Sequence, residues 1–282
     1  MDTSAIAQLQ RFIDQNRKLF ILTGAGCSTD SGIPAYRDKL GSWLGGNPIQ
    51  HQEFLDHHHV RQRYWFRSVF GWKVIGNAQP NLTHKLLAEW EAKGRIELLV
   101  TQNVDCLHRR AGSRSLLELH GRLDQVVCLN CDEVYHREKI QSELESLNRH
   151  VIDAFNHFEP TPGPDGDATF GAVDYSLMEV PSCMSCGGVL KPNVVFFGGN
   201  VPREDVQASY AAVEKCDAVV VIGSSLMVYS GYRFCKRAAE LNKPIVVIND
   251  GRTRADDILS FKLAGDCQQI LSKIQITETT SN

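Results

Sequence analysis

Five short apolar runs constrain the fold of this chain more strongly than any other feature. They are the segments 18–23, 96–101, 194–197, 218–222 and 245–248. Runs that are apolar almost throughout are typical of strands buried on both faces, as in parallel sheets. Helical patterns accompany them at residues 5–17, 202–215 and 229–241. Because strands that alternate with helices form parallel sheets through right-handed crossovers, we predict a doubly wound α/β fold.

Glycine or polar residues directly follow four of these runs. The first run leads into Gly24, Ala25, Gly26 and Ser28, the pattern of a phosphate-binding turn. The other three lead into Gln102, Asn103 and Asp105, into Gly223, Ser224 and Ser225, and into Asn249 and Asp250. The carboxyl ends of parallel strands share one edge of a sheet, so these clusters predict a ligand crevice along that edge. Well-capped turns are the alternative interpretation.

The glycine turn differs from the pattern of hydride-transferring dehydrogenases. Thr29 stands where their third glycine would be, and no acidic residue lies near position 45 to bind a ribose. The turn therefore indicates a bound phosphate without indicating hydride transfer.

Two Cys-x-x-Cys pairs predict a structural zinc site. Cys128 and Cys131 form the first pair, and Cys183 and Cys186 form the second. Together they supply four thiolates for one tetrahedral Zn²⁺, and such a closed shell leaves no position for water or substrate. A redox dithiol is the competing interpretation, which two pairs around one insert disfavour. Within the insert, the segment 160–167 is rich in proline, glycine and aspartate and is predicted to be an exposed loop.

His120 is the candidate general base. It ends the largely apolar stretch 116–119 and precedes Gly121, which leaves room beside the ring. An imidazole that titrates near neutral pH suits a general base. The run 57–59, three consecutive histidines, is predicted to be a solvated surface, because consecutive helical residues point in different directions.

Charge and hydropathy argue against two classes of partner. The formal net charge is −3 and no basic stripe is visible, so we expect no direct nucleic-acid binding. No apolar run approaches the roughly 20 residues that span a bilayer, so we expect no membrane partner. The N-terminus has no signal-peptide or transit-peptide character, and we expect a cytoplasmic protein with reduced cysteines.

Seven stretches of the chain resemble the sirtuin family, and more closely its class II branch. They cover nearly the whole chain in the family's order and with its spacing. The stretches are GAGCSTDSGIPAYR (24–37), TQNVDCLHRRAG (101–112), ELHG (118–121), the two Cys-x-x-Cys pairs, LKPNVVFFG (190–198), VIGSSLMVYSGYR (221–233) and VVIND (246–250).

The resemblance implies a Rossmann-like NAD-binding domain with two inserted modules. The large domain would comprise residues 1–42, 77–124 and 188–282, the helical module 43–76 and the zinc-binding module 125–187. NAD and an acylated lysine of a protein or peptide would enter the cleft between the domain and the modules. The implied assembly is a monomer with one Zn²⁺.

The family's NAD contacts, carried onto this sequence, fall on the sheet-edge clusters. Gly24, Ala25, Gly26 and Ser28 would cradle the pyrophosphate, while Tyr36 would cover the reactive ribose and Arg37 would hold the phosphate end. Asn103 and Asp105 would position the nicotinamide ribose and carboxamide, with Gln102 on a ribose hydroxyl. The remaining implied contacts are Gly223, Ser224, Ser225, Asn249, Asp250 and Cys267.

The implied activity is protein-lysine deacylation with NAD as a co-substrate. Nicotinamide leaves as the acyl oxygen attacks the ribose, and His120 accepts a proton from a ribose hydroxyl. The acyl group ends on ADP-ribose, and Asn103 is the second implied catalytic residue. Residues 194–198 would pair with the substrate as an added strand, and Val195 and Phe197 would line the lysine tunnel.

Tyr64 and Arg67 reproduce a Tyr-x-x-Arg spacing that desuccinylating sirtuins use for an acidic acyl tail. Residues i and i+3 share a helix face, so the pair could grip one carboxylate. We therefore hypothesise a pocket that accepts carboxylated acyl groups. Helix packing is the alternative for these residues.

Two other functions fit the same motifs. A protein ADP-ribosyltransferase would cleave NAD in the same way and use a different nucleophile. A non-catalytic NAD-sensing module would bind the dinucleotide without turnover.

Overall fold

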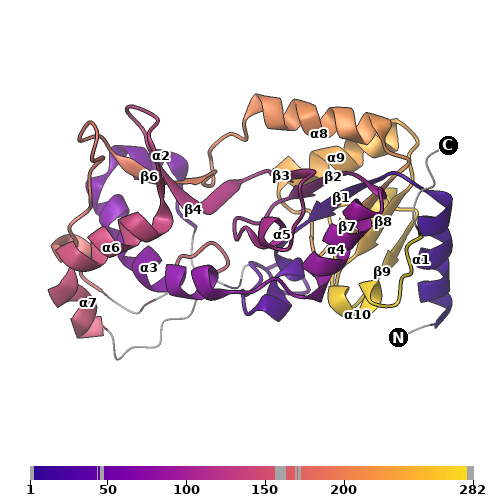
Figure 1. The fold of residues 1–282 in the computed structure, drawn as a ribbon, viewed down its shortest axis with the longest axis horizontal. Helices are drawn as coiled ribbons and strands as arrows, with labels where there is room; N and C mark the ends of the chain where they lie inside the picture. Colours follow the sequence, from indigo (N-terminus) through magenta and orange to yellow (C-terminus); the bar gives the residue numbers. More distant parts are fainter. Residues whose placement is uncertain are drawn as a thin grey trace.

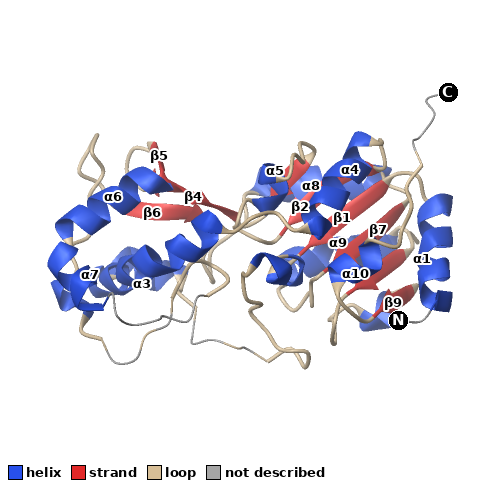
Figure 2. Ribbon diagram, turned by 60° about the horizontal axis from the view of Figure 1, so that its bottom comes forward, coloured by secondary structure: helices blue, strands red, loops and turns tan. Residues whose placement is uncertain are grey.

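The computed structural model describes residues 3–42, 44, 48–155, 163–168, 170 and 173–277. The described chain forms two lobes that lie side by side (Figures 1 and 2). Both chain ends lie on the larger lobe, so the smaller lobe is inserted between segments of the larger one. Within the described residues, no helix is both long and apolar enough to cross a membrane.

The larger lobe is built on a six-stranded sheet in the order β3-β2-β1-β7-β8-β9. All its neighbouring strands are parallel, which confirms the predicted doubly wound sheet. The strands are β1 (Leu19–Thr23), β2 (Ile96–Thr101), β3 (Leu116–Glu118), β7 (Ala218–Ile222), β8 (Ile245–Ile248) and β9 (Phe261–Leu263). The helices around them are α1 (Thr3–Gln15), α4 (Leu82–Ala92), α5 (Leu107–Arg110), α8 (Arg203–Lys215), α9 (Tyr229–Glu240) and α10 (Cys267–Leu271).

Alternate residues of the central strands enter two separate cores. Leu19 and Ile21 of β1 pack in the core formed with α1, α4 and α10. Phe20 and Leu22 pack in the core formed with α8 and α9 on the opposite face. Because both faces are covered, every second position must be apolar on each side, and the strand becomes a continuous apolar run.

The smaller lobe combines a three-stranded antiparallel sheet with four helices. The sheet has the order β5-β4-β6, with β4 (Gly121–Cys128), β5 (Val134–His136) and β6 (Leu190–Val194). The helices are α2 (His51–Asp56), α3 (His58–Asn77), α6 (Arg137–Leu147) and α7 (Arg149–Phe155). Side chains from the predicted helical module and the predicted zinc module pack in one core here. The boundaries between modules stay a prediction.

The prediction that residues 194–197 form a strand of the parallel sheet was wrong. The strand β6 ends at Val194 and pairs antiparallel with β4 in the smaller lobe. Val194 and Phe196 pack in the core of that lobe, together with aromatic residues of α2 and α3. An apolar run shows that a segment is buried, but it does not show in which sheet.

The segment 160–167, predicted to be an exposed loop, is not exposed in its described part. Residues 160–162 lie outside the described residues. Gly166 and Asp167 are buried against α3, where Asp167 forms an ion pair with Arg67. Local turn chemistry predicted the bend correctly, but the tertiary contact with α3 was invisible in the sequence.

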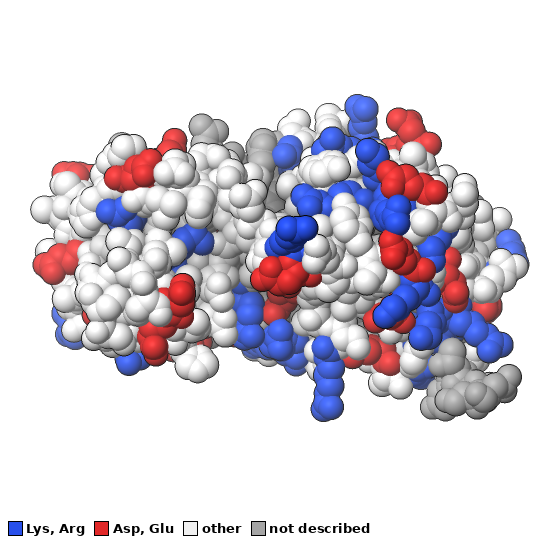
Figure 3. All heavy atoms as spheres, turned by 90° about the horizontal axis from the view of Figure 1, so that it is seen from above, with Lys and Arg blue, Asp and Glu red and all other residues white. Residues whose placement is uncertain are grey.

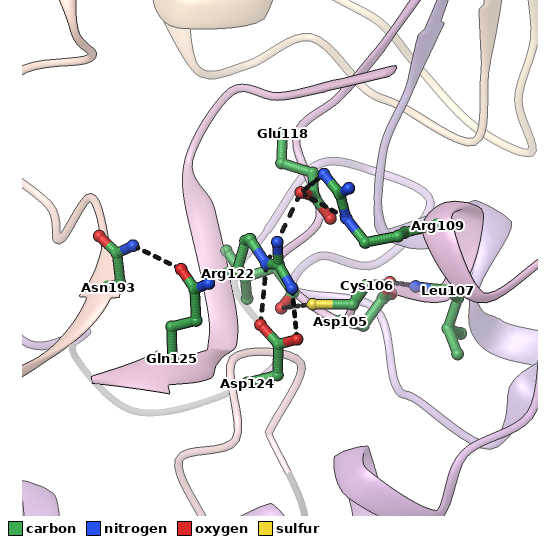
Figure 4. Close-up of polar contacts among 10 residues, drawn as sticks. Asp105, Cys106, Leu107, Arg109, Glu118, Arg122, Asp124, Gln125 and Asn193 are labelled. Carbon is green, nitrogen blue, oxygen red and sulfur yellow. Dashed lines mark hydrogen bonds and ion pairs between the residues drawn. The ribbon is translucent and has the colours of Figure 1, made fainter. Parts of the chain in front are cut away.

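A chain of ion pairs lies where the polypeptide passes from the larger lobe to the smaller one (Figure 4). At the end of β3, Glu118 Oε2 accepts a hydrogen bond of 2.7 Å from Arg109 Nη2 and lies 3.8 Å from Arg122 Nε. Arg122 in turn donates to both carboxylate oxygens of Asp124. These contacts flank residues 119–121 and fix the direction in which the chain leaves the sheet. Elsewhere, charges of both signs are interspersed over the larger lobe on the face seen in Figure 3.

Gly121 allows the chain to pass from the larger lobe to the smaller one, and replacing it should lower the free energy of unfolding. Its φ is +81°, and a Cβ there would overlap the carbonyl oxygen of Asn193 in β6. Gly32 has the same φ of +81°, but no atom lies within 4 Å of where its Cβ would stand, which makes Gly32→Ala a matched control. We expect Gly121→Ala to lose about 3 kcal/mol of unfolding free energy and Gly32→Ala about 1 kcal/mol, from left-handed strain with and without overpacking. Urea titrations of both variants measure the difference, and equal losses would contradict the packing argument.

Candidate functional site

A cavity of about 640 Å³ runs along the carboxyl edge of the parallel sheet. One end is formed by the loops that follow β1, β7 and β8, and the other end by residues of the smaller lobe. His120 lines the same cavity and stands where the chain passes from β3 to β4. The lining includes most residues that the sequence predicted, namely Gly24, Ala25, Gly26, Tyr36, Arg37, Tyr64, Gln102, Asn103, His120, Val195, Phe197, Gly223, Ser224, Ser225, Asn249, Asp250 and Cys267. The predicted crevice at the sheet edge is therefore present.

Two glycines bring the loops after β1 and β7 into contact at this edge. A Cβ on Gly24 would lie 2.8 Å from Ser224 Cβ, and one on Gly26 would lie 2.9 Å from Gly223 Cα. The Gly26 amide also donates to Gly223 O at 2.8 Å. The loops thus form one continuous floor, which only glycine at both positions allows.

Ser28 and Asp105 lie behind this floor and do not line the cavity. Ser28 Oγ donates to Asp105 Oδ2 at 2.6 Å, and Asn103 Nδ2 donates to Ser28 Oγ at 3.1 Å. The second Asp105 oxygen accepts from the Leu107 amide at 2.9 Å. Burial raises the pKa of Asp105, and these two hydrogen bonds partly oppose that rise. In this structure both residues belong to the hydrogen-bond chain that holds Asn103, and the direct NAD contacts predicted for them stay a prediction.

Sequence reasoning missed two buried histidines behind Ser28. His84 lies with Nε2 3.5 Å from Ser28 Oγ, and its ring centroid is 4.6 Å from that of His108. Burial lowers the pKa of His84 to about 4 and that of His108 well below its usual value, so both rings are neutral. Asn81, three residues before His84, forms a capping box with it at the start of α4. This Asn-x-x-His spacing is the signal that could have revealed the pair.

His120 is held in a defined tautomer by contacts on both ring nitrogens. Nδ1 lies 2.9 Å from the Gln102 carbonyl oxygen, which can only accept, so Nδ1 carries the proton. Nε2 lies 2.8 Å from Ser230 Oγ and is left as the basic nitrogen. Burial lowers the pKa of His120, the Gln102 contact raises it, and the nearby Arg233 lowers it further. The ring is therefore neutral near pH 7 and available as a proton acceptor.

Gln102 connects this base to the floor of the cavity. Its side-chain oxygen accepts a hydrogen bond of 2.6 Å from Ser224 Oγ. A Cβ on Gly231 of α9 would lie 2.6 Å from Gln102 Nε2, so the glycine makes room for this side chain. Ser230, Gly231 and Arg233 all come from α9, whose contribution to the site was not predicted.

The segment after β6 forms the wall next to His120. The Val195 amide donates to His120 O at 2.8 Å, and Val195 and Phe197 both line the cavity. Phe197 O accepts from the His51 amide at 2.7 Å, which ties this segment to α2. The wall is thus apolar and is continuous with the smaller lobe.

Only one residue of the predicted pair of Tyr64 and Arg67 lines the cavity. Tyr64 lines the cavity and packs edge-on against Phe54 and Phe196. Arg67 is absent from the lining, and its Nε lies 2.7 Å from Asp167 Oδ1 and donates to Ala168 O at 2.6 Å. The structure thus pairs Arg67 with a carboxylate of the protein itself, and the carboxylate grip predicted from the spacing stays a prediction.

The four paired cysteines come together in the smaller lobe. Their sulfur atoms all lie within 4.8 Å of one another, with Cys128 Sγ 3.5 Å from Cys186 Sγ and Cys131 Sγ 3.7 Å from Cys183 Sγ. Four sulfurs at the usual zinc–sulfur distance of about 2.3 Å in a tetrahedron would be about 3.8 Å apart, so the cluster fits one Zn²⁺. None of the four lines the cavity, which assigns the zinc site a structural role.

Comparisons with known proteins agree with this geometry. The family model described as the Sir2 family matches residues 24–230. A Xanthomonas campestris relative named NAD-dependent protein deacetylase is 50% identical over 97% of this chain and 93% of the relative. A Bos taurus relative named NAD-dependent protein lipoamidase sirtuin-4, mitochondrial, is 44% identical over 97% of this chain and 87% of the relative.

A solved structure described as Sir2 with p53 peptide and NAD⁺ superposes with a TM-score of 0.75. It is 30% identical and covers 97% of both chains. The family model and the relatives both extend over well more than half of the chain. The chain belongs to the Sir2 family.

Proposed function

We propose that this chain is an NAD-dependent protein-lysine deacylase. The observation that carries the proposal is the His120 ring, whose Nδ1 proton is held by Gln102 O and whose Nε2 is left basic on the cavity wall. A neutral imidazole beside a crevice for a dinucleotide suits removal of a proton from a ribose hydroxyl. The relatives named as deacetylases and the Sir2 structure described with peptide and NAD⁺ support the same reaction.

In this proposal NAD is a co-substrate that lies along the sheet edge. The floor made by Gly24, Gly26 and Gly223 approaches its pyrophosphate, because backbone amides next to glycine can reach phosphate oxygens. Asn249 and Cys267 contact its adenosine end. Asp250 supports this end indirectly, since its Oδ2 lies 2.7 Å from Lys39 Nζ.

Asn103 and His120 act at the nicotinamide ribose. The Asn103 side chain donates to Gly24 O at 3.1 Å, which aims its amide group at the floor beside the ribose. Departure of nicotinamide and attack by the acyl oxygen are followed by proton transfer from the ribose hydroxyl to Nε2 of His120. The hydroxyl oxygen attacks the acyl carbon, water adds to that carbon and its bond to the lysine nitrogen breaks, so the products are nicotinamide, the free lysine and O-acyl-ADP-ribose.

The acylated lysine belongs to a protein or peptide chain that pairs with the segment after β6. Residues 195–198 leave the β4–β6 sheet and present backbone groups beside the cavity, so an extended peptide can add to them as a strand. Val195 and Phe197 then surround the aliphatic part of the lysine. We also assign the chain to the class II branch on its motifs.

All nine cysteines lie in the described residues and none of them forms a disulfide, which supports work in a reducing compartment such as the cytoplasm. Burial raises the pKa of Cys106 to about 12, and a hydrogen bond with Cys267, with burial, raises that of Cys27. Thiols with raised pKa values are poor nucleophiles, so packing is the role we assign to Cys27 and Cys106.

Replacing His120 should stop turnover. We expect His120→Ala to lower kcat at least about 100-fold, the usual contribution of a general base, while exposed His58→Ala serves as the matched control. Incubation with NAD and an acetyl-lysine peptide, with nicotinamide and peptide mass measured together, tests this. Recovery of ADP-ribosylated protein in place of O-acyl-ADP-ribose would contradict deacylation.

The pH profile gives an independent test of the base. Because burial lowers the pKa of His120 below its ordinary 6.5, the neutral, basic form persists to lower pH than for a free imidazole. We expect the acid limb of kcat/KM, which reports the free enzyme, to have its midpoint below pH 6.5. A midpoint clearly above this value would mean that another group controls the acid limb.

Removing the metal should unfold the smaller lobe without direct effect on the chemistry. We expect Cys183→Ser to lose stoichiometric zinc and to lower the thermal unfolding midpoint, because metal binding contributes folding free energy. Metal analysis and calorimetry measure both, and Cys235→Ser, a buried cysteine of α9 outside the cluster, is the control for loss of a thiol. Full activity and stability in a zinc-free protein would contradict the structural assignment.

A further inference from the structure

The segment 163–168 is fixed on helix α3 by several independent contacts. A Cβ on Gly71 of α3 would overlap Gly166 O, so the segment lies directly on the helix backbone. Gly166 has a φ of +71° and packs against Leu123 of β4. Arg67 of α3 donates to Ala168 O from the other side. The position of the intervening carboxyl groups is therefore determined by the fold.

This segment carries two neighbouring carboxyl groups, and one of them forms an ion pair with Arg67. Asp167 forms the 2.7 Å ion pair with Arg67, and both side chains are largely buried, 7% and 14% exposed. Asp165 lies on the turn beside it, where its Oδ1 accepts from the Asp167 amide at 3.3 Å. Arg67 also lowers the pKa of Asp165, against a larger rise caused by burial. Arg67 Nε is thus already engaged by Asp167 and by the Ala168 carbonyl oxygen.

Asp165 itself lines the cavity at the end formed by the smaller lobe. Ile49, Tyr64 and Val104 also line the cavity, and all three pack in the core of the smaller lobe. Burial, and after it the charge of Asp165, raises the pKa of Tyr36. These residues mark the part of the cavity that belongs to the smaller lobe. A chain attached to the lysine nitrogen would extend into it if the deacylase function holds.

None of the cations on the described lining belongs to a helix or strand of the smaller lobe. They are Arg37, Lys39 and Arg233. Lys39 pairs with Asp250, Arg37 donates to Gly41 O, and Arg233 lies on α9 beside His120. A carboxylate that entered the Asp165 end would lose its hydration while Arg67 is already paired with Asp167, which is strongly unfavourable, and an ionised Asp165 would add like-charge repulsion.

We propose that Asp165, held against α3 by the Arg67–Asp167 ion pair, selects neutral acyl chains that carry a hydrogen-bond donor near their distal end and rejects chains that end in a carboxylate. The proposal rests on the deacylase function and reverses the acyl preference that the Tyr-x-x-Arg spacing predicted. A distal amide or hydroxyl donates to the Asp165 carboxyl group, which has acceptor capacity beyond its contact with the Asp167 amide.

Three acyl-lysine peptides of matched size test this selection. They carry glutaryl, its amide analogue glutaramoyl, and the apolar analogue 5-methylhexanoyl, with acetyl as the reference for activity itself. For the wild-type protein we expect kcat/KM for glutaryl to be at least about tenfold below that for glutaramoyl, and 5-methylhexanoyl to lie between them.

Variants separate the charge of Asp165 from its hydrogen-bonding capacity. Asp165→Asn should raise the glutaryl-to-glutaramoyl ratio at least about fivefold, and Asp165→Leu should abolish the preference for glutaramoyl over 5-methylhexanoyl. Asp257→Asn, an exposed carboxylate away from the lining, controls for a change in net charge. The charge-balanced double variant Arg67→Ala/Asp167→Ala should not lower the glutaryl-to-glutaramoyl ratio.

Several results would overturn the proposal. They are a wild-type preference for glutaryl over glutaramoyl, a ratio that Asp165→Asn leaves unchanged, and a selective loss of deglutarylation in the double variant, which would mean that Arg67 grips the tail. The order of kcat/KM values for the three peptides with the wild-type protein tests the proposal even if a variant fails to fold. Absence of nicotinamide release with every peptide, acetyl included, would instead refute the deacylase function.

Discussion

The hydrogen bond between His120 Nδ1 and the Gln102 carbonyl oxygen is the interaction on which the site depends. Gln102 is itself fixed, because its amide continues the β1–β2 ladder by donating to Thr23 O at 2.9 Å. From the other side, His120 O accepts from the Val195 amide of the smaller lobe. The imidazole is thus oriented by the parallel sheet while its backbone is bonded to the opposite wall. His120 is therefore bonded both to the parallel sheet, through Gln102, and to the segment after β6, through Val195.

This arrangement requires that the two lobes keep their relation at residues 118–124. Glu118 ends the last strand of the parallel sheet, and Asp124 lies in the first strand of the smaller one. The pairs Arg109–Glu118 and Arg122–Asp124 are partly exposed, so each contributes little alone. They matter because they restrict the conformation of the chain between the lobes. The close contact of Gly121 with Asn193 restricts it further. With the lobes held in this relation, the position of His120 between the two walls of the cleft is fixed.

The sequence predicted some site residues and not others. The difference depends on how far along the chain each residue's hydrogen-bond or ion-pair partner lies. The sheet-edge residues were predictable, since strand polarity alone brings Gly24, Asn103 and Ser224 to one edge. The inward-turned Ser28 and Asp105 were not, because their direction follows from a hydrogen bond between residues 77 positions apart. The ion pair of Arg67 could not be predicted for the same reason, because its partner Asp167 lies far along the chain, beyond the first cysteine pair. Helical spacing shows which residues share a face, but not what covers that face.

The two lobes contribute different parts of the proposed site, and their packing explains the difference. The two groups proposed for chemistry, Asn103 and His120, follow the ends of the parallel strands β2 and β3, and strands buried on both faces tolerate little change. The end of the cavity proposed for the acyl group is lined by Tyr64 of α3 and by Asp165, whose segment contacts Gly71 of α3 and carries the Asp167 partner of Arg67. Substitution in that segment alters the charge at the end of the cavity and leaves the contacts of His120 with Gln102 intact. A fold of this kind can therefore change the acyl group it accepts through a few residues of the smaller lobe, while the sheet that orients the base stays the same.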